Sequence, residues 1–177
     1  MQVRQAQDAV SRSFVGGGPG VVYSGLIWIV AGFVYLRSDV NMAFIVLFLG
    51  GMTIFPVSAL LSRVLFRRPG LSSDNPLGML GLESTIAMLA GLFAAWLFLP
   101  LQSSYVLPLA AIAVGVHYFA FATLYGDKTY WLLAALITAV GFAGIYALGA
   151  MSGAMLFAVG VIELVIGLIL SARALKS

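Results

Sequence analysis

Six apolar runs, each long enough to cross a lipid bilayer, constrain this chain more than any other feature. A membrane-spanning helix needs about 20 predominantly apolar residues. The runs cover approximately residues 19–37, 40–62, 77–99, 104–125, 129–149 and 151–172. The breaks between them are short and contain charged residues, proline or glycine. The sequence therefore predicts an all-α, polytopic membrane protein whose six transmembrane helices form a bundle.

The composition excludes most other classes of protein. Only 8% of the 177 residues are charged and 62% are hydrophobic, whereas about a quarter of a typical soluble domain is charged. A soluble enzyme, a nucleic-acid-binding protein and a disordered chain are therefore not expected. The chain has no cysteine, which removes disulfides, thiolate metal sites and cysteine nucleophiles. We expect no cofactor and no metal, and an enzymatic role is not favoured.

The distribution of basic residues predicts the orientation in the membrane. With six spans, the loops alternate between the two sides, and only Arg37 falls on one side. The other side receives Arg4, Arg12, Arg63, Arg67, Arg68, Lys128, Arg173 and Lys176. Because cytoplasmic loops are enriched in lysine and arginine, both termini are predicted to be cytoplasmic.

The polar N-terminal segment predicts a short amphipathic helix over residues 1–14. Val3, Ala6, Val10 and Phe14 share one helical face, while the charged residues lie elsewhere. Such a helix lies on a membrane surface rather than forming a domain of its own. We therefore expect residues 1–177 to form a single transmembrane domain whose main partner is the lipid bilayer.

Three ionisable residues fall inside the predicted spans: Glu83, His117 and Glu163. Each lies about 9–13 Å from the cytoplasmic end of its helix at about 1.5 Å rise per residue. Small residues share the faces of Glu83 and Glu163, which is typical of close helix contacts in membranes. Both carboxyl groups are therefore expected to point into the bundle, and the three side chains are candidates for one polar intramembrane site.

Two alternatives for these residues stay open. Because intramembrane ionisable groups often mark ion or proton pathways, the protein could be a small transporter or a proton or cation relay, acting as a homo-oligomer. Alternatively, each residue could be a structural hydrogen-bonding group, as in a membrane scaffold or a partner protein that responds to lipid or pH. An intramembrane lipid-modifying enzyme is the least favoured alternative.

A second candidate site would bind an anion or a lipid headgroup at the cytoplasmic surface. Its candidate residues are Gly17, Gly18, Gly20, Arg63, Arg67 and Arg68. Glycine amides that precede a helix can hold a phosphate, and arginine clusters attract anionic lipids. The alternative is that the glycines form a hinge before the first span and that the arginines only fix the orientation.

Several motifs follow one another along the chain. They are Phe14-Val15-Gly16-Gly17-Gly18-Pro19-Gly20 with Ser24-Gly25-Leu26-Ile27-Trp28, Gly50-Gly51-Met52 with Phe55-Pro56, Asn75-Pro76-Leu77-Gly78 with Leu82-Glu83-Ser84, and His117-Tyr118 with Leu124-Tyr125-Gly126. These motifs resemble those of a small uncharacterised family of bacterial multi-pass membrane proteins, a domain of unknown function. The resemblance covers nearly the whole chain. It implies a bacterial inner-membrane location and no established activity, and it places Glu83 and His117 in recurring motifs.

Overall fold

The computed structural model describes residues 2–146 and 152–176, and this part of the chain contains helices and no strand. The α-helices are α1 (Val3–Ser13), α2 (Gly18–Arg37), α3 (Val40–Leu60), α4 (Gly78–Leu97), α5 (Val106–Tyr125), α6 (Thr129–Tyr146) and α7 (Ser152–Lys176). The predicted all-α bundle is confirmed, and the helices from α2 onward begin and end within a few residues of the predicted runs. The predicted break at residues 149–153 falls largely outside the described residues.

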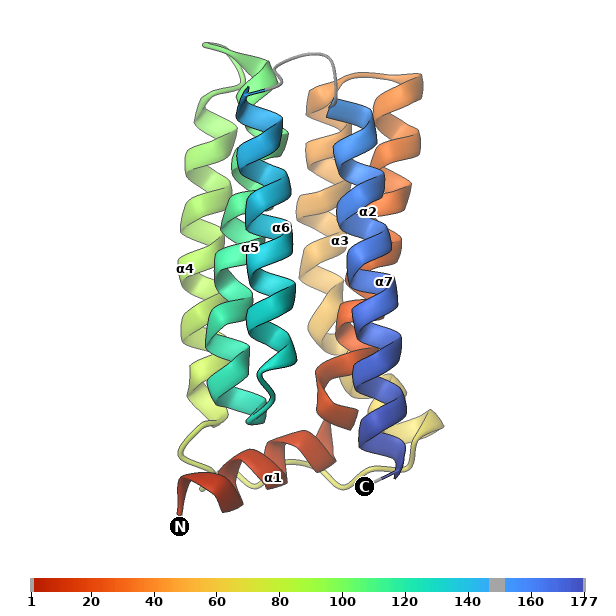
Figure 1. Cartoon of the computed structure of the whole chain (residues 1–177), viewed down its shortest axis with the longest axis vertical. Helices are drawn as coiled ribbons and strands as arrows, with labels where there is room; N and C mark the ends of the chain where they lie inside the picture. The colour runs from red at the N-terminus through yellow and green to blue at the C-terminus, as the bar shows by residue number, and fades with distance from the viewer. Residues whose placement is uncertain (1, 147–151, 177) are drawn as a thin grey trace.

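Five helical stretches in the described ranges are long and apolar enough to cross a membrane. One of them, Gly78–Tyr125, has 48 residues and contains both α4 and α5, which run side by side in Figure 1. The remaining four contain α2, α3, α6 and α7. These apolar helices are those of a membrane protein.

The long helices form two groups of three (Figure 1). In one group α2 lies between α3 and α7, and in the other α5 lies between α4 and α6. The most extensive helix contacts are those of α2 with α7 and of α5 with α6. As a result α3 and α4 are edge helices, and much of their surface is exposed.

Glycine allows the backbones of α2 and α7 to approach closely. An added Cβ at Gly25 would lie 2.7 Å from the carbonyl oxygen of Gly160, and one at Gly160 would lie 2.9 Å from the carbonyl oxygen of Gly25. A Cβ at Gly18 would likewise lie 2.7 Å from the Gly167 carbonyl oxygen. Such contacts leave no room for a side chain. This seam of facing glycines, Gly18 and Gly25 against Gly160 and Gly167, holds α7 in a fixed position on α2.

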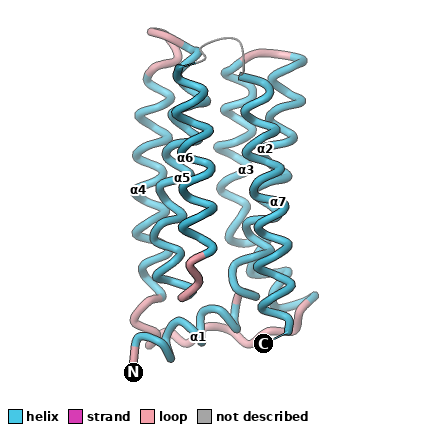
Figure 2. Tube along the Cα trace, in the orientation of Figure 1, coloured by secondary structure: helices cyan, strands magenta, loops and turns pink. Residues whose placement is uncertain are grey.

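Both ends of the described chain lie at one end of the bundle, where α1 crosses beneath the long helices (Figures 1 and 2). The apolar side of α1 faces the protein, since Ala6 and Val10 are fully buried. The side-chain Nδ2 of Asn75 donates to the Ala6 carbonyl oxygen at 3.1 Å and ties α1 to the connection between α3 and α4. The connection between α3 and α4 and the turn between α5 and α6 lie at this same end of the bundle (Figures 1 and 2). The basic residues that are predicted to be cytoplasmic therefore lie together at this end.

Candidate functional site

Glu163 is a fully buried carboxylic acid residue. It belongs to α7 between Gly160 and Gly167 of the glycine seam, and its side chain is 0% exposed. The flanking Val161 and Val165 are about half exposed on the opposite side of α7. The prediction that Glu163 points into the bundle is therefore confirmed.

Tyr118 is the direct hydrogen-bonding partner of Glu163. The Tyr118 hydroxyl on α5 donates to Glu163 Oε1 at 2.9 Å. The buried Ser24 of α2 lies beside both side chains. This arrangement brings three helices together and joins the two three-helix groups. We call Ser24, Tyr118 and Glu163 the core polar site.

The second carboxyl oxygen of Glu163 is unsatisfied. Oε2 is buried and has no hydrogen-bond partner among the described residues, and no ion pair reaches Glu163 in this part of the chain. A buried polar atom without a partner costs about 1–3 kcal/mol. Sequence reasoning had not identified Tyr118 or Ser24 as partners, although a tyrosine and a serine inside apolar spans are themselves a signal.

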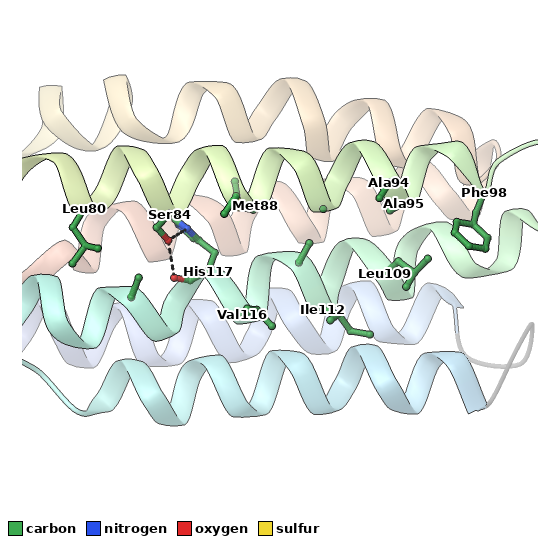
Figure 3. A pocket seen from close by; sticks show the side chains of 14 residues that line it. Leu80, Ser84, Met88, Ala94, Ala95, Phe98, Leu109, Ile112, Val116 and His117 are labelled. Atoms are coloured by element: carbon green, nitrogen blue, oxygen red, sulfur yellow. Dashed lines mark hydrogen bonds between the residues drawn. The ribbon is translucent and has the colours of Figure 1, made fainter.

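His117 belongs to a different polar pair. Its Nδ1 lies 2.6 Å from the Ser84 hydroxyl of α4, and the same hydroxyl donates to the His117 carbonyl oxygen at 3.1 Å. His117 is half-buried and lines a groove between α4 and α5 (Figure 3). The adjacent residues His117 and Tyr118 therefore face different neighbours, and the structure does not place His117 at the core polar site.

The structure places Glu83 on the exposed side of α4, which corrects the expectation that it points into the bundle. The buried residues of α4 are Leu92 and Ala95, which are 6% and 1% exposed. Leu92 lies half a turn away from Glu83 at 100° per residue. The prediction failed because α4 is an edge helix that packs mainly on α5, so that the alanines on the face of Glu83, which are Ala87, Ala90 and Ala94, are exposed. The predicted three-residue site is thus not assembled in this structure.

An aromatic cluster extends from Tyr118 of the core polar site toward α1. It consists of Tyr118, Phe121, Tyr125 and Tyr130, whose neighbouring ring centroids lie 5.2–6.2 Å apart. The Tyr130 hydroxyl donates to the Gly16 carbonyl oxygen at 2.7 Å. This hydrogen bond fixes the cluster to the turn that connects α1 with α2.

The predicted anion-binding glycines are part of this packed turn. Val15, Gly16 and Gly17 have φ values of 52°, 62° and 75°, a left-handed conformation that glycine adopts readily. Gly17 and Gly18 are buried, Gly17 against Tyr125 and Tyr130. These residues form the turn between α1 and α2, while Gly20 is half-buried beside Ser58.

The three arginines differ in their surroundings. Arg68 donates through Nη2 to the Ala174 carbonyl oxygen at 3.0 Å and so binds the last turn of α7. Arg63 and Arg67 are exposed. Anion binding at these positions stays a prediction. Among the described residues, no group of three or more His, Asp or Glu side chains could hold a metal ion.

The fold and the buried carboxyl define a helical membrane protein with an internal polar site. The profile of a family of unknown function, DUF7010, matches residues 3–173, and the chain belongs to this family. This confirms the resemblance to an uncharacterised family. No curated protein and no solved structure matches the chain.

Proposed function

We propose that this protein handles protons within the membrane and that Glu163 is the group that takes up and releases them. The observation that carries the proposal is the unsatisfied Oε2 of Glu163, an atom that is fully buried while Oε1 accepts from Tyr118. An intramembrane carboxyl group without a basic partner is costly to maintain and is a candidate functional group by default.

The surroundings of Glu163 favour a proton over a metal cation. A calcium or magnesium ion in a protein usually has about six or more oxygen ligands, but the core polar site supplies one carboxyl group and two hydroxyl groups. Carboxyl and hydroxyl side chains can exchange protons along hydrogen bonds. Tyr118 is the neighbouring residue for such an exchange, because its hydroxyl already contacts Glu163.

The aromatic cluster would control access from the α1 end. It extends from Tyr118 of the core polar site to the buried Gly16–Gly17 turn, where the Tyr130 hydroxyl donates to the Gly16 carbonyl oxygen. By the positive-inside rule this end is cytoplasmic, and by the family resemblance the membrane is the bacterial inner membrane. The protein acts either alone or as a homo-oligomer.

Proton flux into proteoliposomes tests this proposal. Glu163→Gln keeps the size of the side chain and removes the exchangeable carboxyl proton, so the flux should fall to the level of empty liposomes. Glu83→Gln is the matched control, because it makes the same change on the exposed side of α4, and it should retain the wild-type flux.

If Glu163→Gln conducts protons like the wild type, Glu163 is a structural group that bridges α5 and α7, and the proposal is wrong. The proposal is also wrong if the proton flux of the wild-type protein does not exceed that of empty liposomes under either direction of the pH gradient.

A further inference from the structure

An apolar groove runs between α4 and α5, separate from the core polar site (Figure 3). Its volume is about 610 Å³, which is within the range of small-molecule sites, about 300–1,000 Å³. It extends along α4 from Leu80 to Phe98, a length of about 27 Å at about 1.5 Å per residue. A groove of this shape fits one extended hydrocarbon chain that lies along the helices.

The open side of the groove lies on the lipid-facing surface. Ala87 and Ala94 on α4 and Val116 on α5 line the groove and are also exposed. Neither Glu163 nor Tyr118 lines it. A molecule dissolved in the bilayer can therefore enter sideways, between the edge helix α4 and α5, without passing through the core.

The groove offers hydrogen bonding at one place. Ser84 and His117 are the two polar residues among the 14 that line the groove. None of the 14 is Asp, Glu, Lys or Arg. Ser84 lies six residues after the start of α4, which is about 9 Å along the helix axis. A charged headgroup at this depth would cost several kcal/mol, so the occupant is neutral.

The Ser84–His117 pair determines which hydrogen-bonding group the occupant needs. The Ser84 hydroxyl has one hydrogen, and its contact with the His117 carbonyl oxygen uses that hydrogen because a carbonyl can only accept. The 2.6 Å contact between Ser84 Oγ and His117 Nδ1 is then satisfied when Nδ1 carries the proton. In a neutral imidazole this leaves Nε2 as an acceptor, and the hydrogen bond between the imidazole and the Ser84 hydroxyl uses Nδ1 rather than Nε2.

We propose that the groove between α4 and α5 binds a neutral, single-chain lipid alcohol. Its hydroxyl donates to Nε2 of His117, and its hydrocarbon chain lies along the apolar walls toward Phe98. Ser84 acts as a positioning residue, because its two contacts hold the imidazole in the tautomer that accepts from an alcohol. This inference is independent of the proton-handling role of Glu163.

Photocrosslinking of the full-length protein in phosphatidylcholine nanodiscs tests the proposal. The probe is a long-chain primary alcohol with a photoactivatable diazirine in its chain, and the comparison probe is its methyl ether, which cannot donate. We expect crosslinks on the groove faces of α4 and α5. The alcohol should label about five-fold more than the ether, the equivalent of one hydrogen bond.

Variants locate the binding to the groove. Ala87→Phe fills it and should abolish most of the labelling, whereas Ala90→Phe makes the same change at an exposed position of α4 outside the groove and should leave it unchanged. His117→Leu should reduce alcohol labelling to the level of the ether. Ala94→Phe replaces Ala87→Phe if the latter does not fold, as judged by size-exclusion chromatography and circular dichroism.

Three results would overturn the proposal. Equal labelling of the Ala87→Phe and Ala90→Phe variants would identify the bound molecules as ordinary surrounding lipid. Equal labelling by the alcohol and the ether would exclude donation to Nε2. Groove labelling by a matched fatty acid or phospholipid probe as strong as that by the alcohol would exclude selection for a neutral headgroup.

Discussion

Replacing Gly25 with alanine tests the close contact between α2 and α7. The new Cβ would lie 2.7 Å from the Gly160 carbonyl oxygen and 2.9 Å from the Leu164 amide nitrogen. Both atoms belong to the α7 backbone, so the helices have to separate. Overpacking of this kind costs about 1–3 kcal/mol.

Gly51→Ala is the matched control, because an added Cβ at Gly51 meets nothing within 4 Å. Both glycines lie inside helices, so the gain in helix propensity, about 0.5–1 kcal/mol, applies to both variants and cancels in their difference. The difference in unfolding free energy is therefore about 1–3 kcal/mol. For a chain of this size, each kcal/mol of this difference corresponds to about 2–4 °C in melting temperature.

Thermal unfolding of the two variants in the same detergent, followed by circular dichroism, measures this difference. Gly25→Ala should melt several degrees below Gly51→Ala. If the two variants melt together, or if Gly25→Ala is the more stable, then α2 and α7 are not in backbone contact, and the account of how Glu163 is enclosed is wrong.

Three further predictions follow from the site and the topology. Tyr118→Phe removes the hydrogen bond to Glu163 and should lower both the proton flux in liposomes and the unfolding free energy, the latter by about 1 kcal/mol; unchanged flux would contradict a role for Tyr118 in proton exchange. Gly17→Ala places a Cβ against Tyr130 at a residue with a left-handed backbone conformation, and it should lower the unfolding free energy by about 1–2 kcal/mol or more. A thermal melt measures this loss, and wild-type stability of the variant would contradict it. Single cysteines at Ser38 and Ser72, in a chain that has no cysteine, should react with an impermeant reagent from opposite sides of the membrane, and labelling of both from the same side would contradict six spans.

The sequence predicted the helices well because the apolar runs and the turns between them are local features. Gly18-Pro19 begins α2, and the Asp39 side chain accepts from the Met42 amide and caps α3. The burial of Glu163 was predictable for a related reason. The glycines on its own face of α7 indicated a close helix contact, and the structure places α2 there.

The arrangement of helices around one another was not predictable from local patterns. The alanines of α4 are compatible with either a helix contact or a lipid-facing surface, and only the position of α4 at the edge of the bundle decides between them for Glu83. For the same reason, the sequence could not separate His117, which faces α4 and Ser84, from Tyr118, which faces α7 and Glu163.

Infrared difference spectroscopy of the reconstituted protein observes the protonation of Glu163 itself. The pH is stepped across the range in which the protein stays folded, and the carbonyl stretch of the protonated carboxyl group is recorded. We expect a band that changes with pH in the wild type and in Glu83→Gln and that is absent from Glu163→Gln. A band that persists in Glu163→Gln, or a wild-type carboxyl signal that never changes, would contradict the claim that Glu163 takes up and releases protons.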